Sequence, residues 1–115
     1  MKEIKLIGIY GILIDNKVVY VGKSKNIFKR IRAEGSHIKR IGNDKEQCRK
    51  YELLRAAQDE GHKIAFTIIE LCSEEKIDER KDFYLLTLKP ILNSSLPNGV
   101  YKDIRNYTLT DLLKN

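Results

Sequence analysis

Two short apolar segments near the start of this 115-residue chain, separated by a turn signal, constrain its fold most strongly. Residues 5–14 are rich in β-branched and aromatic side chains and include Gly8 and Gly11. This composition predicts a largely buried strand that another backbone approaches closely at the glycines. Residues 15–17 (Asp-Asn-Lys) predict a turn, and residues 18–22 predict a second strand. The two segments therefore predict a β-hairpin.

The rest of the chain predicts helices and one more strand. Ser24 or Asn26 can cap a helix that begins near Ile27, and Gly35 is expected to end it. The resulting order, ββααβα, predicts an α+β fold with a three-stranded antiparallel sheet flanked by helices. The remaining expected elements are a helix over about 44–60, a strand over 63–72, a helix from 73 to the residue before Pro90, a turn at 97–99 and a short terminal helix.

Length and composition predict one compact domain in the cytoplasm. No apolar run approaches the roughly 20 residues that a membrane span needs, and the charged start of the chain is not typical of a signal peptide. Cys48 and Cys72 are far apart and lack partners in metal-binding spacing, so we expect two reduced cysteines. The expected location is therefore cytoplasmic, without contact to a membrane.

Positive charge is concentrated in one part of the chain. The formal net charge is +6, and residues 23–55 hold eleven Lys or Arg against four Asp or Glu. A local cationic region favours a polyanionic partner, most simply DNA, although lysine-rich surfaces also serve solubility alone. The basic residues that we expect to bind DNA are Lys25, Lys29, Arg32, Lys39, Arg40, Lys45 and Arg49.

Tyr10 and Tyr20 are expected on the same face of the hairpin, because side chains alternate along neighbouring strands. Two phenols in such positions can simply belong to the core, and the pattern alone favours that interpretation. Lys23 and Arg30 follow closely, however, and nearby positive charge can lower the pKa of a tyrosine. Such a phenol could accept a proton from water, while a guanidinium holds a phosphodiester through two parallel hydrogen bonds.

Several ordered segments resemble the GIY-YIG nuclease family. Residues 8–10 (GIY) and 20–22 (YVG) match its two signatures at a suitable spacing. Residues 22–26 followed by Arg30 look like the family's loop and its arginine-bearing helix, and residues 88–93 (LKPILN) look like its last core segment. The resemblance covers residues 4–93. It implies a nuclease domain over 1–93, with residues 94–115 as an extension that packs on the same domain.

The resemblance implies metal-dependent hydrolysis of DNA phosphodiesters. Tyr10 would deprotonate or position the attacking water, and Tyr20 would orient the site. Lys23 and Arg30 would hold the phosphate, and Asn93 would match the family's supporting asparagine. In the family, a glutamate on the third helix binds one divalent metal, here Mg²⁺ or Mn²⁺.

Two positions depart from the family pattern. A histidine that many members place one turn after the arginine is Glu34 here; His37 lies nearby as a possible substitute, although a loop histidine exposed to solvent is the simpler interpretation. The expected metal-binding glutamate falls on Lys81. Helical periodicity places Lys81 in the stripe that faces the core, whereas Asp78 lies at its edge and Glu74 lies two turns earlier. Asp78 or Glu74 is therefore the candidate metal ligand.

The sequence thus favours a DNA endonuclease of the GIY-YIG type that uses a divalent metal. One alternative is a catalytically weakened relative that binds nucleic acid without cutting it, and another is a protein-interaction module on the same scaffold. The sequence holds no obvious second DNA-reading domain such as a helix-turn-helix or zinc finger. Specificity would then be low, or would come from a homodimer or a separate partner.

Overall fold

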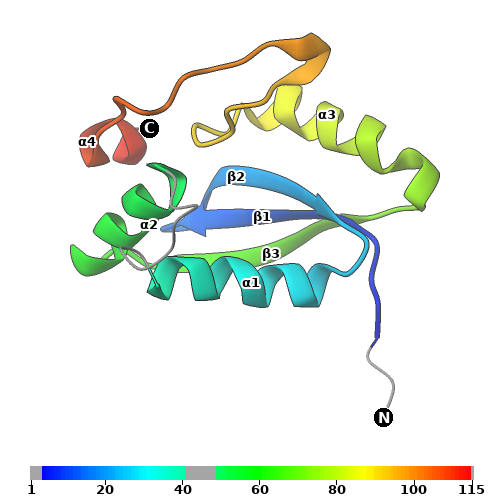
Figure 1. Cartoon of the computed structure of the whole chain (residues 1–115), viewed down its shortest axis with the longest axis horizontal. Coiled ribbons are helices and arrows are strands. Elements are labelled where there is room, and N and C mark those ends of the chain that lie inside the picture. Colours follow the sequence, from blue (N-terminus) through cyan, green and yellow to red (C-terminus); the bar gives the residue numbers. More distant parts are fainter. Residues whose placement is uncertain (1–3, 41–48, 115) are drawn as a thin grey trace.

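A three-stranded antiparallel sheet in the order β2-β1-β3 forms the centre of the molecule (Figure 1). The computed structural model describes residues 4–40 and 49–114. The strands are β1 (Gly8–Ile14), β2 (Lys17–Ser24) and β3 (Ile64–Leu71), so all three expected strands are confirmed within a few residues. The α+β class is likewise confirmed.

The β1–β2 connection is a tight two-residue turn. Asp15 and Asn16 both have positive φ, 48° and 71°, as the turns that match the twist of a hairpin require. The Asp15 carboxylate also accepts a hydrogen bond from the backbone N–H of Lys63 at 2.9 Å and contacts His62. One short polar side chain therefore fixes the hairpin tip to the start of β3.

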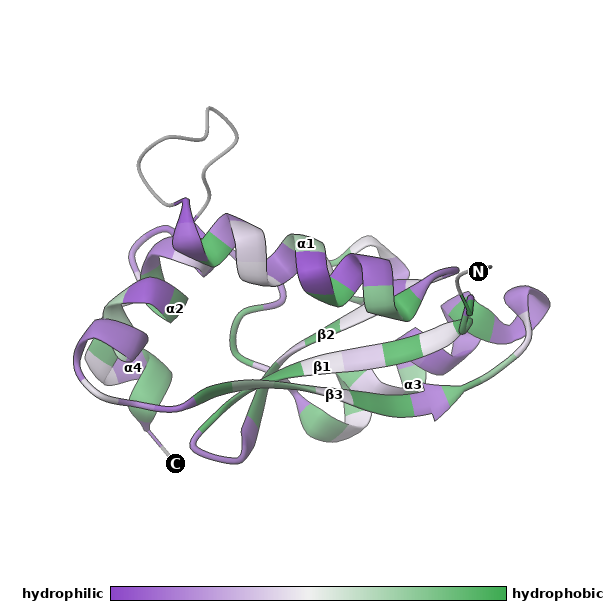
Figure 2. Cartoon of the chain, turned by 90° about the horizontal axis from the view of Figure 1, so that it is seen from below, coloured by the Kyte–Doolittle hydropathy of each residue, from purple (hydrophilic) through white to green (hydrophobic). Residues whose placement is uncertain are grey.

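Helices cover both faces of the sheet. In Figure 1 the strands lie between α1 and α3, and in Figure 2 α1 lies to one side of the strands whereas α3 overlaps them. The apolar cluster on the α1 and α2 side includes Tyr10, Ile12 and Leu54, whereas the other cluster joins Ile9 of β1 to α3. Neighbouring strand residues point to opposite faces, so Ile9 and Tyr10 enter different clusters. The helices are α1 (Ile27–Lys39), α2 (Arg49–Asp59), α3 (Ile77–Leu88) and α4 (Leu109–Leu113), with short 3₁₀ turns η1 (Glu74–Lys76) and η2 (Pro97–Gly99).

The C-terminal residues pack against the first apolar cluster. Ile104 is 6% exposed and Leu112 is 1% exposed, and both belong to the cluster that contains Tyr10. Thr108 caps α4 through a reciprocal pair of hydrogen bonds with Asp111. Within the described part of the chain, no helix combines the length and the apolar character needed to cross a membrane.

The expected end of the first helix at Gly35 is wrong, because α1 continues to Lys39. The extra turn buries Ile38, which is 3% exposed. Burying such a side chain contributes roughly 1.5–3 kcal/mol, more than the roughly 1 kcal/mol cost of a glycine inside a helix. His37 accordingly lies on a helix and not in a loop. The expected start of the second helix near residue 44 falls outside the described residues.

The two signature strands fit together because Gly22 lacks a side chain. Gly22 pairs with Tyr10 across the hairpin, and a methyl group built on Gly22 would lie 2.4 Å from the Tyr10 ring. A methyl group on Gly8 would likewise lie 2.1 Å from the carbonyl oxygen of Glu70 on β3. Both glycines are therefore required by close approach, as the sequence predicted for Gly8.

We predict that Gly22→Ala destabilises the fold by about 1–3 kcal/mol, because the buried Tyr10 ring must move to admit the methyl group. Gly35→Ala is the matched control, since nothing lies within 4 Å of its added methyl group. That change should stabilise α1 by about 0.5–1 kcal/mol. Urea unfolding of both variants measures the two effects, and equal stabilities would contradict the packing argument.

Candidate active site

Tyr10 and Tyr20 lie on the same face of the sheet, as predicted. Their ring centroids are 6.4 Å apart, and the register places Tyr10 opposite Gly22 and Tyr20 opposite Ile12. Tyr10 is only 1% exposed, whereas Tyr20 is half-buried. The hairpin therefore holds one phenol inside the protein and a second phenol closer to the surface.

The buried carboxylate of Glu34 organises this site. Glu34 is 0% exposed and accepts hydrogen bonds from the Tyr10 hydroxyl at 2.9 Å, from Lys50 Nζ at 3.2 Å and from the Tyr51 hydroxyl. Lys50 Nζ also lies 3.8 Å from the centroid of the Tyr20 ring. His37 packs against Tyr51, with ring centroids 5.0 Å apart. One carboxylate thus joins β1, α1 and α2.

Our sequence interpretation missed Lys50 and Tyr51 as members of the site. A usable signal was the position of Glu34 on the stripe of α1 that also contains Ile27, Ile31 and Ile38. A carboxylate on a buried stripe needs partners, because an unpaired buried charge is costly. The pattern required partners for Glu34, but it did not say which side chains of α2 would supply them.

The ionisation of this cluster differs from our expectation for Tyr10. Burial raises the pKa of the Tyr10 hydroxyl far above its ordinary value, and the neighbouring Glu34 carboxylate raises it further. The prediction of a lowered pKa is therefore wrong for Tyr10, because burial and the Glu34 carboxylate together outweigh the hydrogen bond from Arg30, which by itself lowers this pKa. Burial alone would raise the pKa of Glu34, but the charge of Lys50 and the hydrogen bonds from Tyr51 and Tyr10 together hold this pKa below its ordinary value.

Arg30 lies at the entrance to the buried cluster. Its Nε donates to the Tyr10 hydroxyl at 3.3 Å, and its Nη2 lies 3.9 Å from Glu34 Oε1. The Arg30 side chain remains 45% exposed. The guanidinium therefore contacts the site with one edge and leaves donors for an anion from solvent.

Helix α3 packs on the sheet face opposite α1, and an ion pair between α3 and β3 holds it there. Arg80 donates two hydrogen bonds of 2.7 Å to the Glu70 carboxylate, and the Tyr84 hydroxyl donates a third at 2.7 Å. This arrangement turns Lys81 toward the site. Burial lowers the pKa of Lys81, and the charges of Lys23 and Arg30 lower it further.

The segment that follows α3 closes the edge of the sheet. Asn93 Nδ2 donates to the carbonyl oxygen of Val21 at 2.8 Å, and Asn93 Oδ1 accepts from the N–H of Val21 at 2.9 Å. The N–H of Leu92 donates to the carbonyl of Val19 at 2.9 Å. Asn93 thus satisfies the backbone of β2 where a further strand would pair, and it acts as a positioning residue here.

A cleft of about 250 Å³ lies at this edge of β2. It brings together Tyr20, Lys81 and Asn93, three of the residues that the sequence analysis singled out. The other residues that line it are Lys50, Leu92, Ser94 and Ser95.

The two candidate metal ligands lie in a neighbouring pocket of about 440 Å³. Asp78 pairs with the ammonium of Lys23, and Glu74 pairs with the ammonium of Lys25 at 2.5 Å. Both carboxylates are therefore neutralised by lysines. Within residues 4–40 and 49–114, no group of three or more His, Cys, Asp or Glu side chains is arranged to hold a metal ion. The described residues thus do not fit a divalent cation unless Lys23 or Lys25 moves away from its carboxylate.

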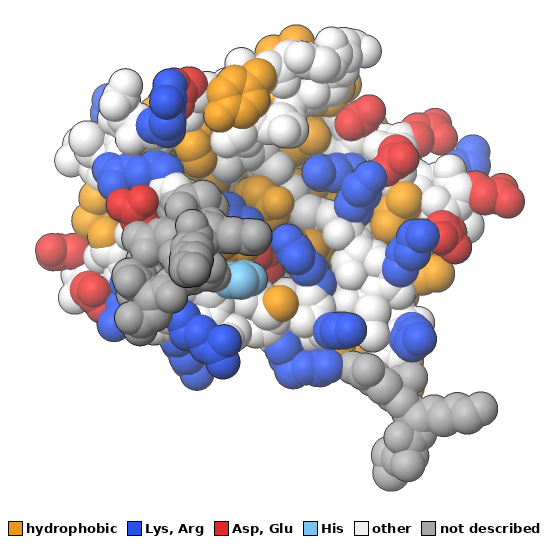
Figure 3. Space-filling view, in the orientation of Figure 1, with side chains coloured by type: hydrophobic (Ala, Val, Ile, Leu, Met, Phe, Trp, Pro, Cys, Tyr) orange, Lys and Arg blue, Asp and Glu red, His pale blue; other side chains and the backbone are white. Residues whose placement is uncertain are grey.

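Most of the basic residues expected to bind DNA are exposed to solvent. Lys29, Arg32 and Lys39 are exposed on α1, and Figure 3 shows Lys and Arg side chains along the part of the surface over this helix. Lys25 and Arg40 are also exposed. Two cases are different: Arg49 donates to the carbonyl oxygen of Tyr107 at 2.6 Å, and Lys45 lies outside the described residues.

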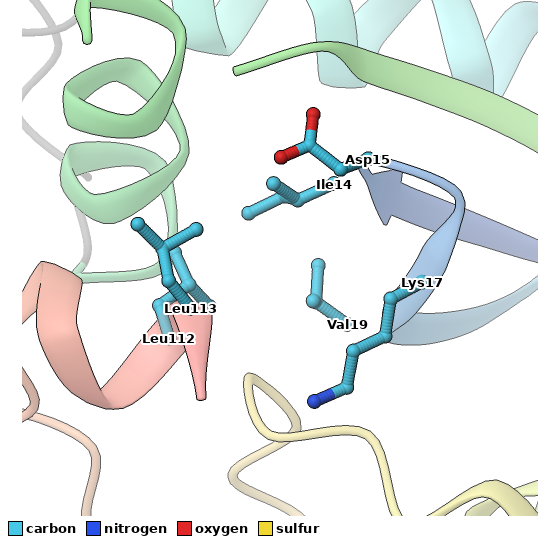
Figure 4. Close-up of a pocket in the computed structure, with 6 residues that line it drawn as sticks. All are labelled: Ile14, Asp15, Lys17, Val19, Leu112 and Leu113. Atoms are coloured by element: carbon cyan, nitrogen blue, oxygen red, sulfur yellow. The ribbon is translucent and has the colours of Figure 1, made fainter. Parts of the chain in front are cut away.

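A small pocket at the hairpin tip has a structural role. Its volume is about 110 Å³, and it lies between the β1–β2 turn and α4 (Figure 4). Ile14, Val19, Leu112 and Leu113 form most of its wall, and Lys17 Nζ donates to the carbonyl oxygen of Lys114 at 2.5 Å. These contacts hold the C-terminal helix against the hairpin.

Comparisons with known proteins support the nuclease fold. No family model matches the sequence, and no curated protein matches it. A solved structure of a mutant of bacteriophage T4 EndoII matches with a TM-score of 0.61 and 25% sequence identity. The match covers 81% of this chain and 77% of that chain. EndoII is an endonuclease of the GIY-YIG type, and the α+β architecture described above is consistent with its fold.

We predict that Glu34→Gln destabilises the protein by about 3–5 kcal/mol at pH 7, because Lys50 then keeps a buried charge without its partner. The folded state lowers the pKa of Glu34, so its carboxylate stabilises the protein above the ordinary pKa of 4.5 and loses this effect as the pH falls through the folded-state pKa. The stability difference between the variant and the wild type should therefore shrink below about pH 4.5.

Urea unfolding between pH 3 and 8 checks this prediction. Glu60→Gln, at an exposed position just after the end of α2, is the control and should change stability by less than about 0.5 kcal/mol. A wild type and a Glu34→Gln variant of equal stability at pH 7 would show that the buried network contributes nothing.

Proposed function

We propose that this protein is a DNA endonuclease of the GIY-YIG type and that its site lies at the edge of β2. The observation that carries the proposal is the meeting of Arg30 and Tyr10 at the mouth of a buried carboxylate network. The charges of Arg30 and Lys23 also act on Lys81, so a third cation belongs to the same region. Cations beside a proton-transfer group are what hydrolysis of a phosphodiester needs. The likeness to T4 EndoII supports the same activity.

Proton transfer in this proposal involves Tyr10 and Glu34 together. Tyr10 keeps its proton, so it cannot act as a free phenolate. A water molecule at the Tyr10 oxygen could give its proton to that oxygen while the Tyr10 hydroxyl proton passes to Glu34 Oε2, 2.9 Å away. The hydroxide so formed would attack phosphorus, and the bond from phosphorus to the leaving sugar oxygen would break. That oxygen would take a proton from solvent, and Arg30 would neutralise the phosphate oxygens.

The substrate is DNA in this proposal, and the exposed cations of α1 extend the site along the nucleic acid. Sequence selection would come from a homodimer or a separate partner, and the expected location is the cytoplasm. Mg²⁺ or Mn²⁺ is the expected cofactor by resemblance, with Asp78 or Glu74 as ligand. Because the lysine pairing described above does not fit such an ion, no step of the proposed proton transfer depends on it.

A second candidate function is binding of DNA without cleavage. The specific observation in its favour is Lys81, whose ammonium stands where the resemblance requires a metal-binding carboxylate. An ammonium attracts a phosphate but cannot coordinate a metal. The same cleft would then serve to hold DNA, and a protein-interaction module would differ from both candidates by binding without a strong dependence on salt.

We predict that the wild type nicks supercoiled DNA and that Tyr10→Phe lowers the rate by about 10²–10⁴-fold, because the variant lacks the hydroxyl of the proton-transfer pair. Arg30→Ala should lower the rate to a similar extent. Tyr101→Phe is the matched control, since Tyr101 is 68% exposed and lies outside the cleft. The assay compares EDTA, Mg²⁺ and Mn²⁺ on supercoiled, linear and branched DNA.

Circular dichroism should show that Tyr10→Phe remains folded. Nicking by Tyr10→Phe at the wild-type rate would contradict the proton-transfer role. Wild-type binding without nicking in any of the three conditions would support the second candidate instead.

We also predict that DNA affinity falls steeply with salt, because each neutralised phosphate releases counterions. Replacing Lys29, Arg32 and Lys39 together with glutamine should reduce the slope of log K against log salt by about 2–3. Fluorescence anisotropy at several salt concentrations measures the slope. An unchanged slope would place the DNA-binding surface away from α1.

A further inference from the structure

Lys50 and Lys81 line the same cleft, but only Lys50 has a balancing charge. Lys50 is paired with Glu34 at 3.2 Å. Lys81 is half-buried and forms no hydrogen bond or ion pair with any other residue in the described part of the chain. Asp78 and Asp82 act on Lys81 only as more distant charges. The cleft therefore contains one uncompensated ammonium group.

The surroundings of Lys81 are cationic as well. The positive charges of Lys23 and Arg30 both act on Lys81 and disfavour its charged form. Lys23 is paired with Asp78, and Arg30 is only 3.9 Å from Glu34, so these two cations have partners. Without an anion, a half-buried lysine in this position destabilises the fold. A bound anion would remove that cost.

The cleft also supplies neutral donors. Ser94 and Ser95 line it, and neither hydroxyl is bonded to a described residue. The two hydrogen bonds between the Asn93 side chain and the backbone of Val21 on β2 fix the chain immediately before these serines. The cleft volume of about 250 Å³ is far above the roughly 10–15 Å³ that one water molecule needs in the same measure, so a phosphate group with part of its hydration shell can enter.

We infer that this cleft binds a backbone phosphate of the DNA, with Lys81 as its charged contact and Ser94 and Ser95 as neutral donors, and that this binding needs no divalent metal. The inference rests on the proposed function, because it takes the phosphate from the same DNA. It adds a phosphate contact to the proposed site, and it makes Lys81 a binding residue whose positive charge attracts that phosphate.

The test measures binding of a fluorescein-labelled DNA duplex by the full chain, with EDTA and with Mg²⁺. Wild-type affinity should agree within about twofold between the two conditions. Lys81→Met keeps an unbranched side chain one atom shorter and removes the charge, and it should weaken binding about tenfold in EDTA and reduce the salt slope by about 1. Lys81→Arg should bind within about threefold of the wild type.

Lys63→Met is the matched control, since Lys63 is exposed beside the hairpin tip and lies outside the cleft. It should bind DNA within about twofold of the wild type. Thermal unfolding provides a second measurement. Lys81→Met should unfold at the same temperature as the wild type or a higher one, because it removes an unpaired half-buried charge. A loss of DNA affinity without a loss of stability is what a binding role requires.

Two results would overturn the inference without contradicting the nuclease proposal. In the first, the Lys81→Met variant binds DNA as tightly as the Lys63→Met variant. In the second, DNA binding by the wild type disappears in EDTA. Inorganic phosphate tests the other source of the ligand. If phosphate raises the wild-type unfolding temperature through Lys81 while Lys81→Met binds DNA normally, the cleft serves free phosphate and the inference is wrong. Absence of wild-type DNA binding in every condition would remove the proposed function itself.

Discussion

The buried charge of Glu34 is the interaction on which the rest of this site depends. Its carboxylate is fully enclosed and accepts hydrogen bonds from Tyr10 on β1 and from Lys50 and Tyr51 on α2. An enclosed carboxylate is tolerated only when its partners satisfy it. The same bonds therefore fix the angle of α1 against the sheet, hold Tyr10 over Gly22 and place Arg30 at the entrance.

This dependence changes the chemistry available to Tyr10. A phenol among cations alone would ionise more easily, but here the phenol is buried and bonded to a carboxylate, and these two effects outweigh the hydrogen bond from Arg30. The positive charge of Lys50 stabilises the ionised form of Glu34, and the ionised Glu34 in turn stabilises the protonated form of Tyr10. Any basic function at the Tyr10 oxygen must consequently involve Glu34, which makes the two residues one functional unit.

The sequence was sufficient for features set by local pattern and not for those set by distant contacts. The hairpin, the shared face of Tyr10 and Tyr20 and the order of elements followed from alternation and turn residues. The end of α1 was missed because Gly35 is a local stop signal, whereas the burial of Ile38 that overrides it is a tertiary contact. Lys50 was missed as a partner of Glu34 because the partners are 16 residues apart and meet only when α1 packs on α2.

The edge of β2 explains why cations gather at one place. An open sheet edge exposes unpaired backbone groups and is normally covered. Here the side chain of Asn93 covers it by satisfying both polar groups of Val21, so the following residues turn away and no strand is added. Covering the edge with the Asn93 side chain and the N–H of Leu92 leaves a cleft beside it instead of a fourth strand. Arg80 and Glu70 hold α3 against β3, which directs Lys81 into that cleft. A structural need, protection of a sheet edge, thereby creates the concave cationic surface that a phosphodiester can enter.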